Sequence, residues 1–266
     1  FTGRSINEIN LYPSEMASAL CSIDRVSASA NMTNRLSEAI VEAYKETNGT
    51  PITFTKMLEE YQSKMVDPSK DDTISSVLKQ LVRANIFEEE DKADLIGDCY
   101  IIKMDGYPKD GPIAKAIVYF LISKLNNIYE QLEKQATNDE VVQIRHFSII
   151  DEAHYMLDFD NRPLRNLIAV GRNKGLSIIL ATQNMSSFKS KGFDFYANAQ
   201  YPLIMKQQTI DDKVIKDLFG VSGNELQEIR TAIAGLQKGE LIIKDQMAFA
   251  LGMGKKYKKI NVTHLI

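Results

Sequence analysis

Two adjacent carboxylates, Asp151 and Glu152, follow a short apolar run at residues 146–150. Such a run predicts a buried β-strand, and the carboxyl ends of strands in open α/β sheets are where ligands bind. In a site that hydrolyses ATP, an Asp at this point holds Mg²⁺ on the β- and γ-phosphates, and a following Glu orients the attacking water. Asp151 is therefore a candidate Mg²⁺ ligand and Glu152 a candidate catalytic residue. The alternative is that Asp151 only caps the helix after the strand.

A second polar pair, Thr182 and Gln183, ends another predicted strand at residues 176–182. If the two strands are neighbours, their carboxyl ends meet at one edge of the sheet, beside Asp151 and Glu152. Thr182 is then a candidate nucleotide-binding residue, and Gln183 a candidate sensor of the γ-phosphate or the attacking water. The alternative is a polar pair that merely terminates a strand.

The elements that must position these residues fall into two parts. Residues 14–87 are predicted to be helical after an extended or loop-like segment at residues 1–13. Thr53 can cap one of these helices, and the acidic residues Asp71 and Asp72 lie at the positive end of another. From about residue 98, apolar strands alternate with helices, which predicts right-handed crossovers and a mostly parallel sheet. The predicted strands cover residues 99–104, 146–150, 176–182 and 201–205, the helices 113–134, 163–173, 211–219 and 224–231, and a terminal hairpin 240–251. We expect a mainly helical insertion subdomain over residues 1–97 and an α/β part over residues 98–266.

Composition narrows the class of protein. The 266 residues are 44% hydrophobic and 25% charged, as in an ordinary globular protein, and contain no apolar run long enough to span a membrane. Two cysteines and three scattered histidines predict neither a disulfide framework nor a zinc site, and fit a reducing, cytoplasmic location. The net charge of −3 argues against general polyanion binding. One local basic run, at residues 255–259, is either a nucleic-acid patch or a solvated tail.

Several runs together resemble the HerA/FtsK branch of hexameric DNA-translocase ATPases. They are Ile-Ile-Asp-Glu-Ala-His at residues 149–154, Val-Gly-Arg-Asn-Lys-Gly at 170–175, Leu-Ser-Ile-Ile-Leu-Ala-Thr-Gln at 176–183 and Leu-Gln-Lys-Gly-Glu-Leu-Ile-Ile at 236–243. The coupling ATPases of conjugation and type IV secretion share the central runs. Within the branch, the chain most resembles, in its overall sequence and in no single motif, the DptH-like ATPases of phosphorothioation-dependent DNA restriction systems.

This resemblance implies a RecA-like P-loop NTPase core that uses ATP and Mg²⁺, forms a homo-oligomeric ring, usually a hexamer, and moves double-stranded DNA. In such rings an arginine of one subunit reaches the γ-phosphate bound by its neighbour. Arg172 is the first candidate for that role and Arg165 the second; the alternative for each is a surface ion pair. Lys189 and Lys191 are candidates for nucleic-acid contacts in a pore-facing loop. A nuclease or other restriction proteins are the expected partners, and a membrane is not.

One expected motif is missing. The phosphate-binding loop has the pattern Gly-x-x-x-x-Gly-Lys-Ser/Thr, and the sequence contains no such run. In the family this loop precedes the helical insertion, and the chain begins without Met, so we expect that the P-loop segment lies upstream. Without the backbone amides and lysine of this loop, the phosphates have no cradle. The 266 residues alone are therefore predicted to bind ATP poorly and not to hydrolyse it.

Three other interpretations stay open. Asp-Glu-Ala-His is also the box of superfamily-2 helicases, but no Gln-x-x-Gly-Arg-x-Gly-Arg motif follows it. The chain could also be a scaffold subunit with a relic ATPase fold. A conjugation or secretion coupling ATPase would carry the same motifs.

Overall fold

The computed structural model describes residues 6–23, 28–46, 52–85, 94–138, 141–157, 159, 161–183, 185–190 and 193–262. The chain divides into two compact units, Phe1–Ser148 with Asp158–Ser177, and Ile149–Leu157 with Ile178–Ile266. Strands β3 (His146–Ile150) and β4 (Leu176–Leu180) each begin in the first unit and end in the second. None of the helices in the described ranges has the length and apolar composition needed to cross a membrane.

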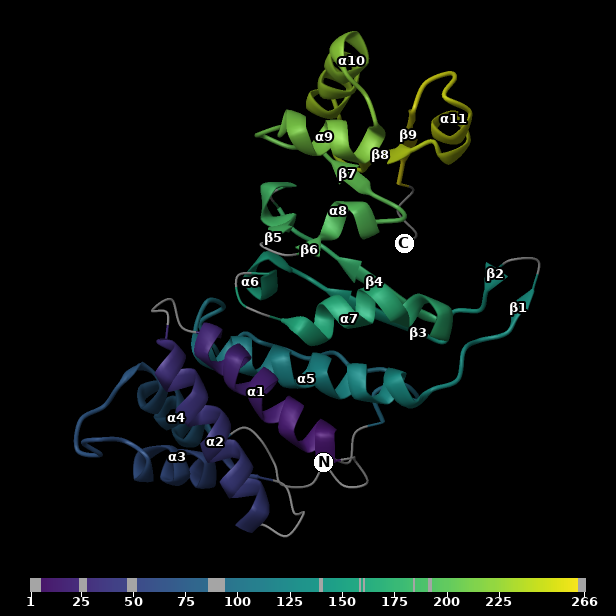
Figure 1. The fold of residues 1–266 in the computed structure, drawn as a ribbon. Helices are drawn as coiled ribbons and strands as arrows, with labels where there is room; N and C mark the ends of the chain where they lie inside the picture. Colours follow the sequence, from purple (N-terminus) through teal and green to yellow (C-terminus); the bar gives the residue numbers. More distant parts are fainter. Residues whose placement is uncertain are drawn as a thin grey trace. The chain divides into compact units, whose positions relative to one another are not determined.

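The first unit is mainly helical (Figure 1). It contains α1 (Ile6–Ile23), α2 (Ala30–Glu46), α3 (Phe54–Ser63), α4 (Thr73–Ala84), α5 (Pro112–Gln131), α7 (Arg162–Val170), the 3-10 helix η1 (Gly171–Lys174) and a hairpin of β1 (Thr137–Asn138) and β2 (Val141–Val142). Each of the first four helices contacts the next, and α5 contacts α1, α4 and α7. Helix α2 supplies Leu36, Ile40 and Ala43 to a core in which all three are fully buried.

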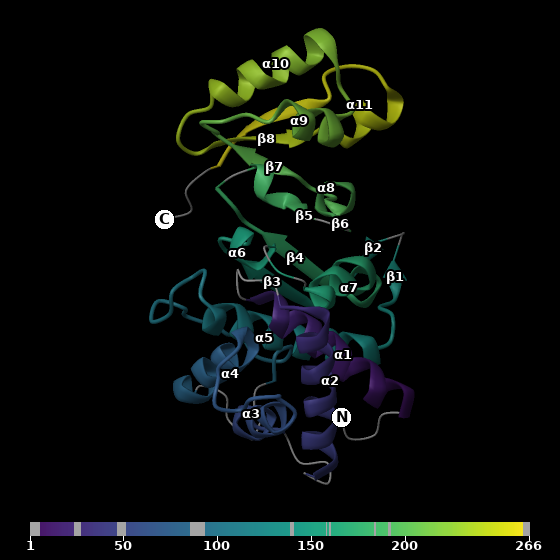
Figure 2. The ribbon, with the colours of Figure 1, turned by 60° about the vertical axis from the view of Figure 1, so that its left-hand side comes forward.

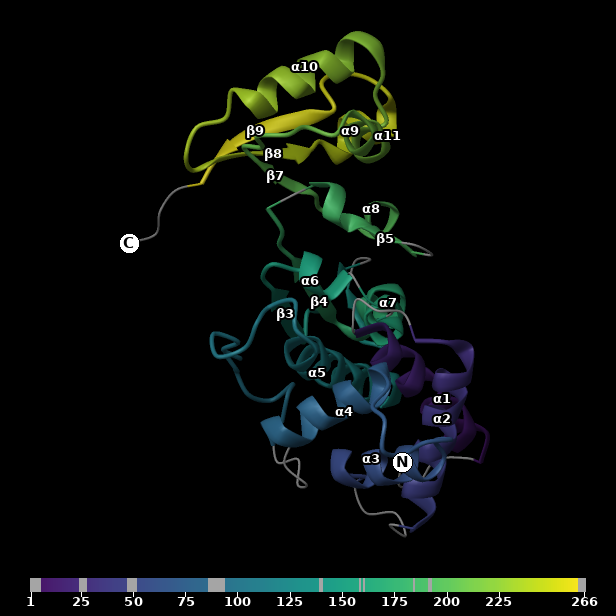
Figure 3. The same ribbon diagram turned by 90° about the vertical axis from the view of Figure 1, so that its left-hand side faces the viewer.

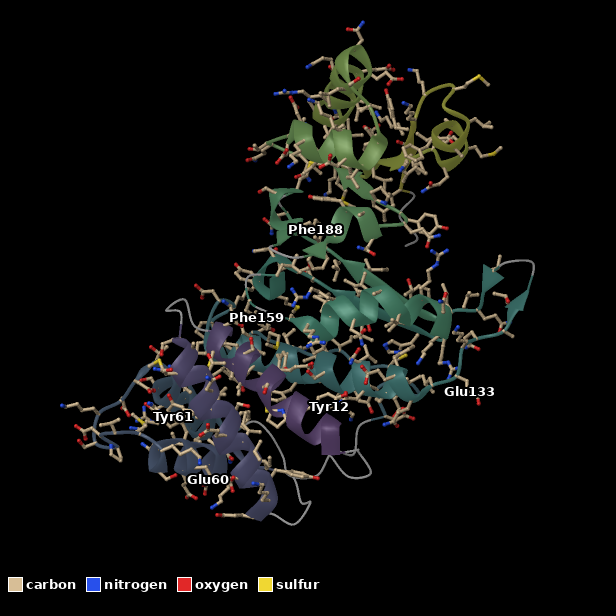
Figure 4. The ribbon with its side chains drawn as sticks, viewed as in Figure 1. Tyr12, Glu60, Tyr61, Glu133, Phe159 and Phe188 are labelled. Carbon is tan, nitrogen blue, oxygen red and sulfur yellow. The ribbon has the colours of Figure 1, made fainter. Side chains whose placement is uncertain are left out.

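The predicted cap at Thr53 is confirmed, and of the two acidic residues expected at the start of the next helix, Asp72 is the one that caps it. The Thr53 hydroxyl accepts the N–H of Lys56 at 3.1 Å and so starts α3. Asp72 starts α4 with a capping box, in which its carboxylate accepts the N–H of Ser75 and the Ser75 hydroxyl accepts the N–H of Asp72. The second oxygen of Asp72 accepts the hydroxyl of Tyr61 at 2.6 Å, inside the helical bundle where Figure 4 labels this ring. It also lies 3.4 Å from Arg35.

Replacing Asp72 should therefore cost much more than an ordinary surface substitution. We expect Asp72→Ala to lower the free energy of unfolding by about 2 to 4 kcal/mol, because it removes the cap and leaves the buried Tyr61 hydroxyl without its hydrogen-bond acceptor. Asp71→Ala is the matched control, since Asp71 is the exposed neighbour that pairs with Lys79, and it should cost about 0.5 kcal/mol or less. Chemical denaturation of both variants measures the difference, and equal losses would contradict the assigned role of Asp72.

Two predictions for the first unit are wrong. Residues 6–13 are not extended, because α1 already includes them and accommodates Pro13 within the helix. Residues 99–104 do not form a buried strand, since no strand is hydrogen-bonded to them and Ile101 is 90% exposed. The apolar composition of this run was correctly recognised, but a strand forms only where a neighbour satisfies its backbone groups.

The second unit is built on an antiparallel sheet of order β7–β8–β9, formed by Leu203–Met205, Glu240–Lys244 and Tyr257–Asn261. Helices α9 (Asp212–Phe219) and α10 (Gly223–Ala234) cover one face of this sheet (Figure 2). Ile204 and Ile242 point into that interface and pack with Val214, Phe219 and Ile229 in one apolar core. The unit also contains α6 (His154–Leu157), η2 (Met185–Phe188), β5 (Lys189–Ser190), β6 (Phe193–Asp194), α8 (Phe195–Asn198) and α11 (Gln246–Leu251).

The predicted terminal hairpin is half right. Strand β8 forms as expected, but its partner is β9, and the residues expected to return as a strand form α11 instead (Figure 3). The carboxylate of Asp245 accepts the N–H groups of Met247 and Ala248, and Gly252 ends the helix in the left-handed conformation. These two caps favour a helix over a tight turn.

Candidate functional site

The carboxyl ends of β3 and β4 lie side by side, as the sequence predicted. At the start of the pair, the N–H groups of Arg145 and His146 donate to the carbonyl of Gly175. At the other end, the N–H of Ala181 donates to the carbonyl of Ile150, and the N–H of Ala153 to that of Ala181. Because the start of β3 pairs with the chain just before β4, and the last residue of β3 pairs with the chain just after β4, the two strands are parallel. The bond between Ala153 and Ala181 lies beyond the ends of both strands. The polar residues that follow the two strands are therefore held next to each other.

Glu152 is the centre of the site. The amide of Gln183 donates from Nε2 to Glu152 Oε1, so the two residues singled out on separate strands are in direct contact. The other carboxylate oxygen, Oε2, is shielded from solvent and accepts no hydrogen bond from the described residues, and Nδ1 of His154 lies 3.3 Å from it. The Glu152 backbone has a φ of 51°, a left-handed conformation that is uncommon for a residue with a side chain. Such geometry is often found at functional sites, where the surrounding contacts compensate for its cost.

Asp151 is exposed at the same turn. Its Oδ1 accepts the N–H of Glu152 at 2.9 Å. The amides of Tyr155 and Met156, at the start of α6, instead donate to the backbone carbonyls of Glu152 and Ala153. The alternative interpretation, in which Asp151 serves only as a helix cap, therefore has no support from these bonds.

The exposed carboxylate at this turn suits Mg²⁺, which is bound largely by water and phosphate, better than it suits a cation bound only by protein side chains. Among the described residues, no group of three or more His, Cys, Asp or Glu side chains is placed to hold a metal ion. Mg²⁺ does not require such a cage, because it keeps several waters and takes one or two carboxylates together with substrate phosphates. One exposed carboxylate at the end of a strand, Asp151, is consistent with that mode. The described residues contain no loop that would cradle the phosphates themselves.

Thr182 lies on the other side of the same cluster. Its hydroxyl is 3.3 Å from Nδ1 of His154, which therefore approaches both Thr182 and Glu152. The sequence interpretation had not assigned a role to His154. The available signal was its position, three residues after Asp151 at the end of the strand, where the chain turns back toward the end of β4.

Comparison with known proteins supports the fold. No protein-family model matches the chain, and no curated protein sequence was found to match it. The structure of VirB4 of Thermoanaerobacter pseudethanolicus is similar with a TM-score of 0.60 and 18% identity, covering 96% of this chain and 70% of that chain. The bacterial conjugative coupling protein TrwB is similar with a TM-score of 0.50 and 10% identity, covering 96% of this chain and 68% of that chain. The chain has a RecA-like α/β fold. At these identities the likeness concerns the fold, which confirms the predicted fold class.

The first candidate arginine of this RecA-like chain, Arg172, lies on η1 directly before β4 and is exposed. Two glycines define this short helix: a Cβ at Gly171 would meet Leu176 at 2.8 Å, and Gly175 has a φ of 82°. Lys174 fixes the same helix by donating from Nζ to the carbonyls of Tyr129 and Glu130 at the end of α5. Arg172 therefore projects from a firmly held turn, and within the described part of the chain its guanidinium makes no ion pair.

The second candidate, Arg165, lies on α7 and is half-buried, so it is less accessible to a neighbouring molecule than Arg172. Of the candidate nucleic-acid contacts, Lys189 starts β5, where its backbone pairs with Asp194. Lys191 lies outside the described residues.

The basic run at residues 255–259 is neither a tail nor an unbalanced patch. It leads into and forms part of β9, and each lysine pairs with a carboxylate of the second unit. The ion pairs are Lys255–Glu228 at 2.7 Å, Lys256–Glu225 at 3.4 Å, Lys258–Asp245 at 2.8 Å and Lys259–Glu240 at 2.6 Å. The paired lysines hold the pKa values of Glu228, Asp245 and Glu240 below their usual range. Lysines on an edge strand also discourage pairing with another sheet.

Proposed function

We propose that this chain is the catalytic part of an ATP-driven translocase motor of the HerA/FtsK kind, which acts as a homo-oligomeric ring on DNA. The observation that carries the proposal is the contact between Glu152 and Gln183 at the parallel ends of β3 and β4. A carboxylate and an amide meeting at this edge of a RecA-like sheet suit the hydrolysis of a nucleoside triphosphate. The contact joins two residues that are 31 positions apart in the sequence.

The roles follow from the chemistry of each group. Asp151 would hold Mg²⁺, mainly through water, and the ion would offset charge on the β- and γ-phosphates. Glu152 would orient and polarise the attacking water, while Gln183 and Thr182 would respond to the γ-phosphate. The phosphate cradle would have to come from a segment other than these 266 residues, so we expect them to bind ATP poorly when tested alone.

A second candidate function has its own support. The coupling protein TrwB is a conjugative protein, as its name states, and its structure matches 96% of this chain. A motor that moves protein or single-stranded DNA in conjugation or secretion is therefore the main rival to one that moves duplex DNA. Nothing in the described residues favours the narrower role in phosphorothioation-dependent restriction, with its nuclease partners, over these two.

The stimulation of ATP hydrolysis by nucleic acid tests the proposal. We expect the complete protein to hydrolyse ATP faster in the presence of duplex DNA than with single-stranded DNA of the same length. Stimulation by single-stranded DNA alone would transfer support to the coupling function. If the oligomeric protein does not hydrolyse ATP with either kind of DNA or without DNA, the motor proposal fails. A scaffold with a relic ATPase fold then becomes the better explanation.

A further inference from the structure

His154 connects the two strand ends of the candidate site. Its Nδ1 lies 3.3 Å from Glu152 Oε2 on one side and 3.3 Å from the Thr182 hydroxyl on the other. Its ring packs against Tyr155 with centroids 4.1 Å apart, and its side chain is 31% exposed. With Gln183 on Oε1, the Glu152 carboxylate thus has a different neighbour at each of its two oxygens.

The chemistry of these contacts assigns the proton of the ring. An ionised carboxylate only accepts hydrogen bonds, so an unprotonated Nδ1 would direct its lone pair at Glu152 Oε2 and repel it. A proton on Nδ1 can be shared between Glu152 and Thr182, and Nε2 is then the nitrogen with the lone pair. Because hydrogen-bond partners fix which imidazole nitrogen carries the proton, the Nδ1-protonated tautomer is the one in which His154 can hold Glu152.

We propose that His154 is a positioning residue that holds the Glu152 carboxylate in the orientation needed for hydrolysis; this role rests on the proposed ATPase function. Gln183 cannot hold Glu152 permanently if its amide also responds to a γ-phosphate. Glu152 Oε2 is buried without a hydrogen-bond partner among the described residues, and Nδ1 of His154 lies 3.3 Å from it. When the Gln183 amide turns away, a rotation of the imidazole ring that lets Nδ1 donate to Oε2 would keep the carboxylate from rotating. The second contact of the ring, with Thr182, ties that orientation to the end of β4.

Three substitutions separate positioning from simple packing. Asn carries its amide nitrogen on Cγ, as the imidazole carries Nδ1, whereas Gln carries its amide one bond further out. We expect His154→Ala and His154→Gln to lower kcat of the complete protein about 10- to 100-fold, the usual effect of removing a group that orients a functional residue. The KM for ATP should change much less than kcat, and His154→Asn should recover most of the loss. Wild-type kcat in His154→Ala, or equal losses in the Ala and Asn variants, would overturn the proposal.

A measurement that needs no turnover tests the contact itself. The ¹⁵N chemical shifts of the histidine rings report which nitrogen is protonated, and the His154→Asn spectrum assigns the signal of His154. We expect the Nδ1-protonated form in the neutral ring and its loss in Glu152→Ala; an Nε2-protonated ring would overturn the proposal. Equally inert wild-type and Glu152→Gln proteins would overturn the ATPase function and this role together. An active wild type with an unaffected His154→Ala variant would overturn the role of His154 alone.

Discussion

Glu152→Gln should lower the rate of ATP hydrolysis by about 10²- to 10⁴-fold, the usual contribution of a positioned general base. The amide has nearly the same shape as the carboxylate, and its oxygen can still accept the hydrogen bond from Gln183. It cannot take a proton from the attacking water, so binding of ATP should persist while turnover is lost. Steady-state hydrolysis and equilibrium binding of ATP by the complete protein measure the two effects separately.

Asp151→Asn is the informative companion to this variant. It removes charge from the candidate Mg²⁺ ligand, so its activity should depend on a higher Mg²⁺ concentration, whereas that of Glu152→Gln should not. A Glu152→Gln protein that hydrolyses ATP at the wild-type rate would contradict the assignment of the catalytic carboxylate. The two variants therefore distinguish the roles given to neighbouring residues.

The backbone at Glu152 adds a comparison based on stability. Its φ of 51° is strained for any residue with a Cβ but not for glycine. Glu152→Gly and Glu152→Ala both remove the carboxylate, and only glycine relieves the strain, which costs on the order of 1 kcal/mol. We therefore expect Glu152→Gly to melt a few degrees above Glu152→Ala while both are inactive. That result would mean that the strained turn is kept for function at the expense of stability.

The local chemistry of the chain was predictable from its sequence. Thr53 caps a helix where expected, and an acidic residue starts α4 as expected, because a helix start depends on a few adjacent residues. The contact between Glu152 and Gln183 was also predicted, since it needs only that two successive strands be parallel neighbours. His154 ends the Asp-Glu-Ala-His run, but roles were predicted only for the two carboxylates of that run. The position of His154 next to Thr182 and Glu152 depends on the left-handed backbone conformation of Glu152, which the sequence does not predict.

Burial was the property that the sequence predicted least well. The run at residues 146–150 forms the expected strand, yet Phe147 is 56% and Ile149 70% exposed. An apolar run predicts that a strand can be buried, but it does not say which element buries it. The same limit explains residues 99–104, where the expected strand is absent. At α11, by contrast, the error was local, because the capping by Asp245 was overlooked.

Arg172→Ala should lower ATP turnover by about 10³-fold or more if its guanidinium stabilises charge on the γ-phosphate held by a neighbouring subunit. Its exposure on a turn fixed by Lys174 is the feature that suits it to reach another molecule. Arg162→Ala is the matched control, because Arg162 is an exposed arginine that already pairs with Glu15 at 2.6 Å and should matter little. A larger loss in Arg165→Ala than in Arg172→Ala would move the assignment to Arg165.

Mixing two inactive variants decides whether the arginine acts between subunits. An active site needs Glu152 from one subunit and Arg172 from its neighbour, so a mixed ring contains sites in which both are intact. With equal amounts of Glu152→Gln and Arg172→Ala subunits placed at random, about one site in four has both groups, and about a quarter of wild-type activity should return. If the arginine instead serves the site of its own subunit, every site lacks one of the two groups and the mixture stays inactive. Recovery of activity would therefore establish both the role of Arg172 and the shared site that makes a ring necessary for hydrolysis.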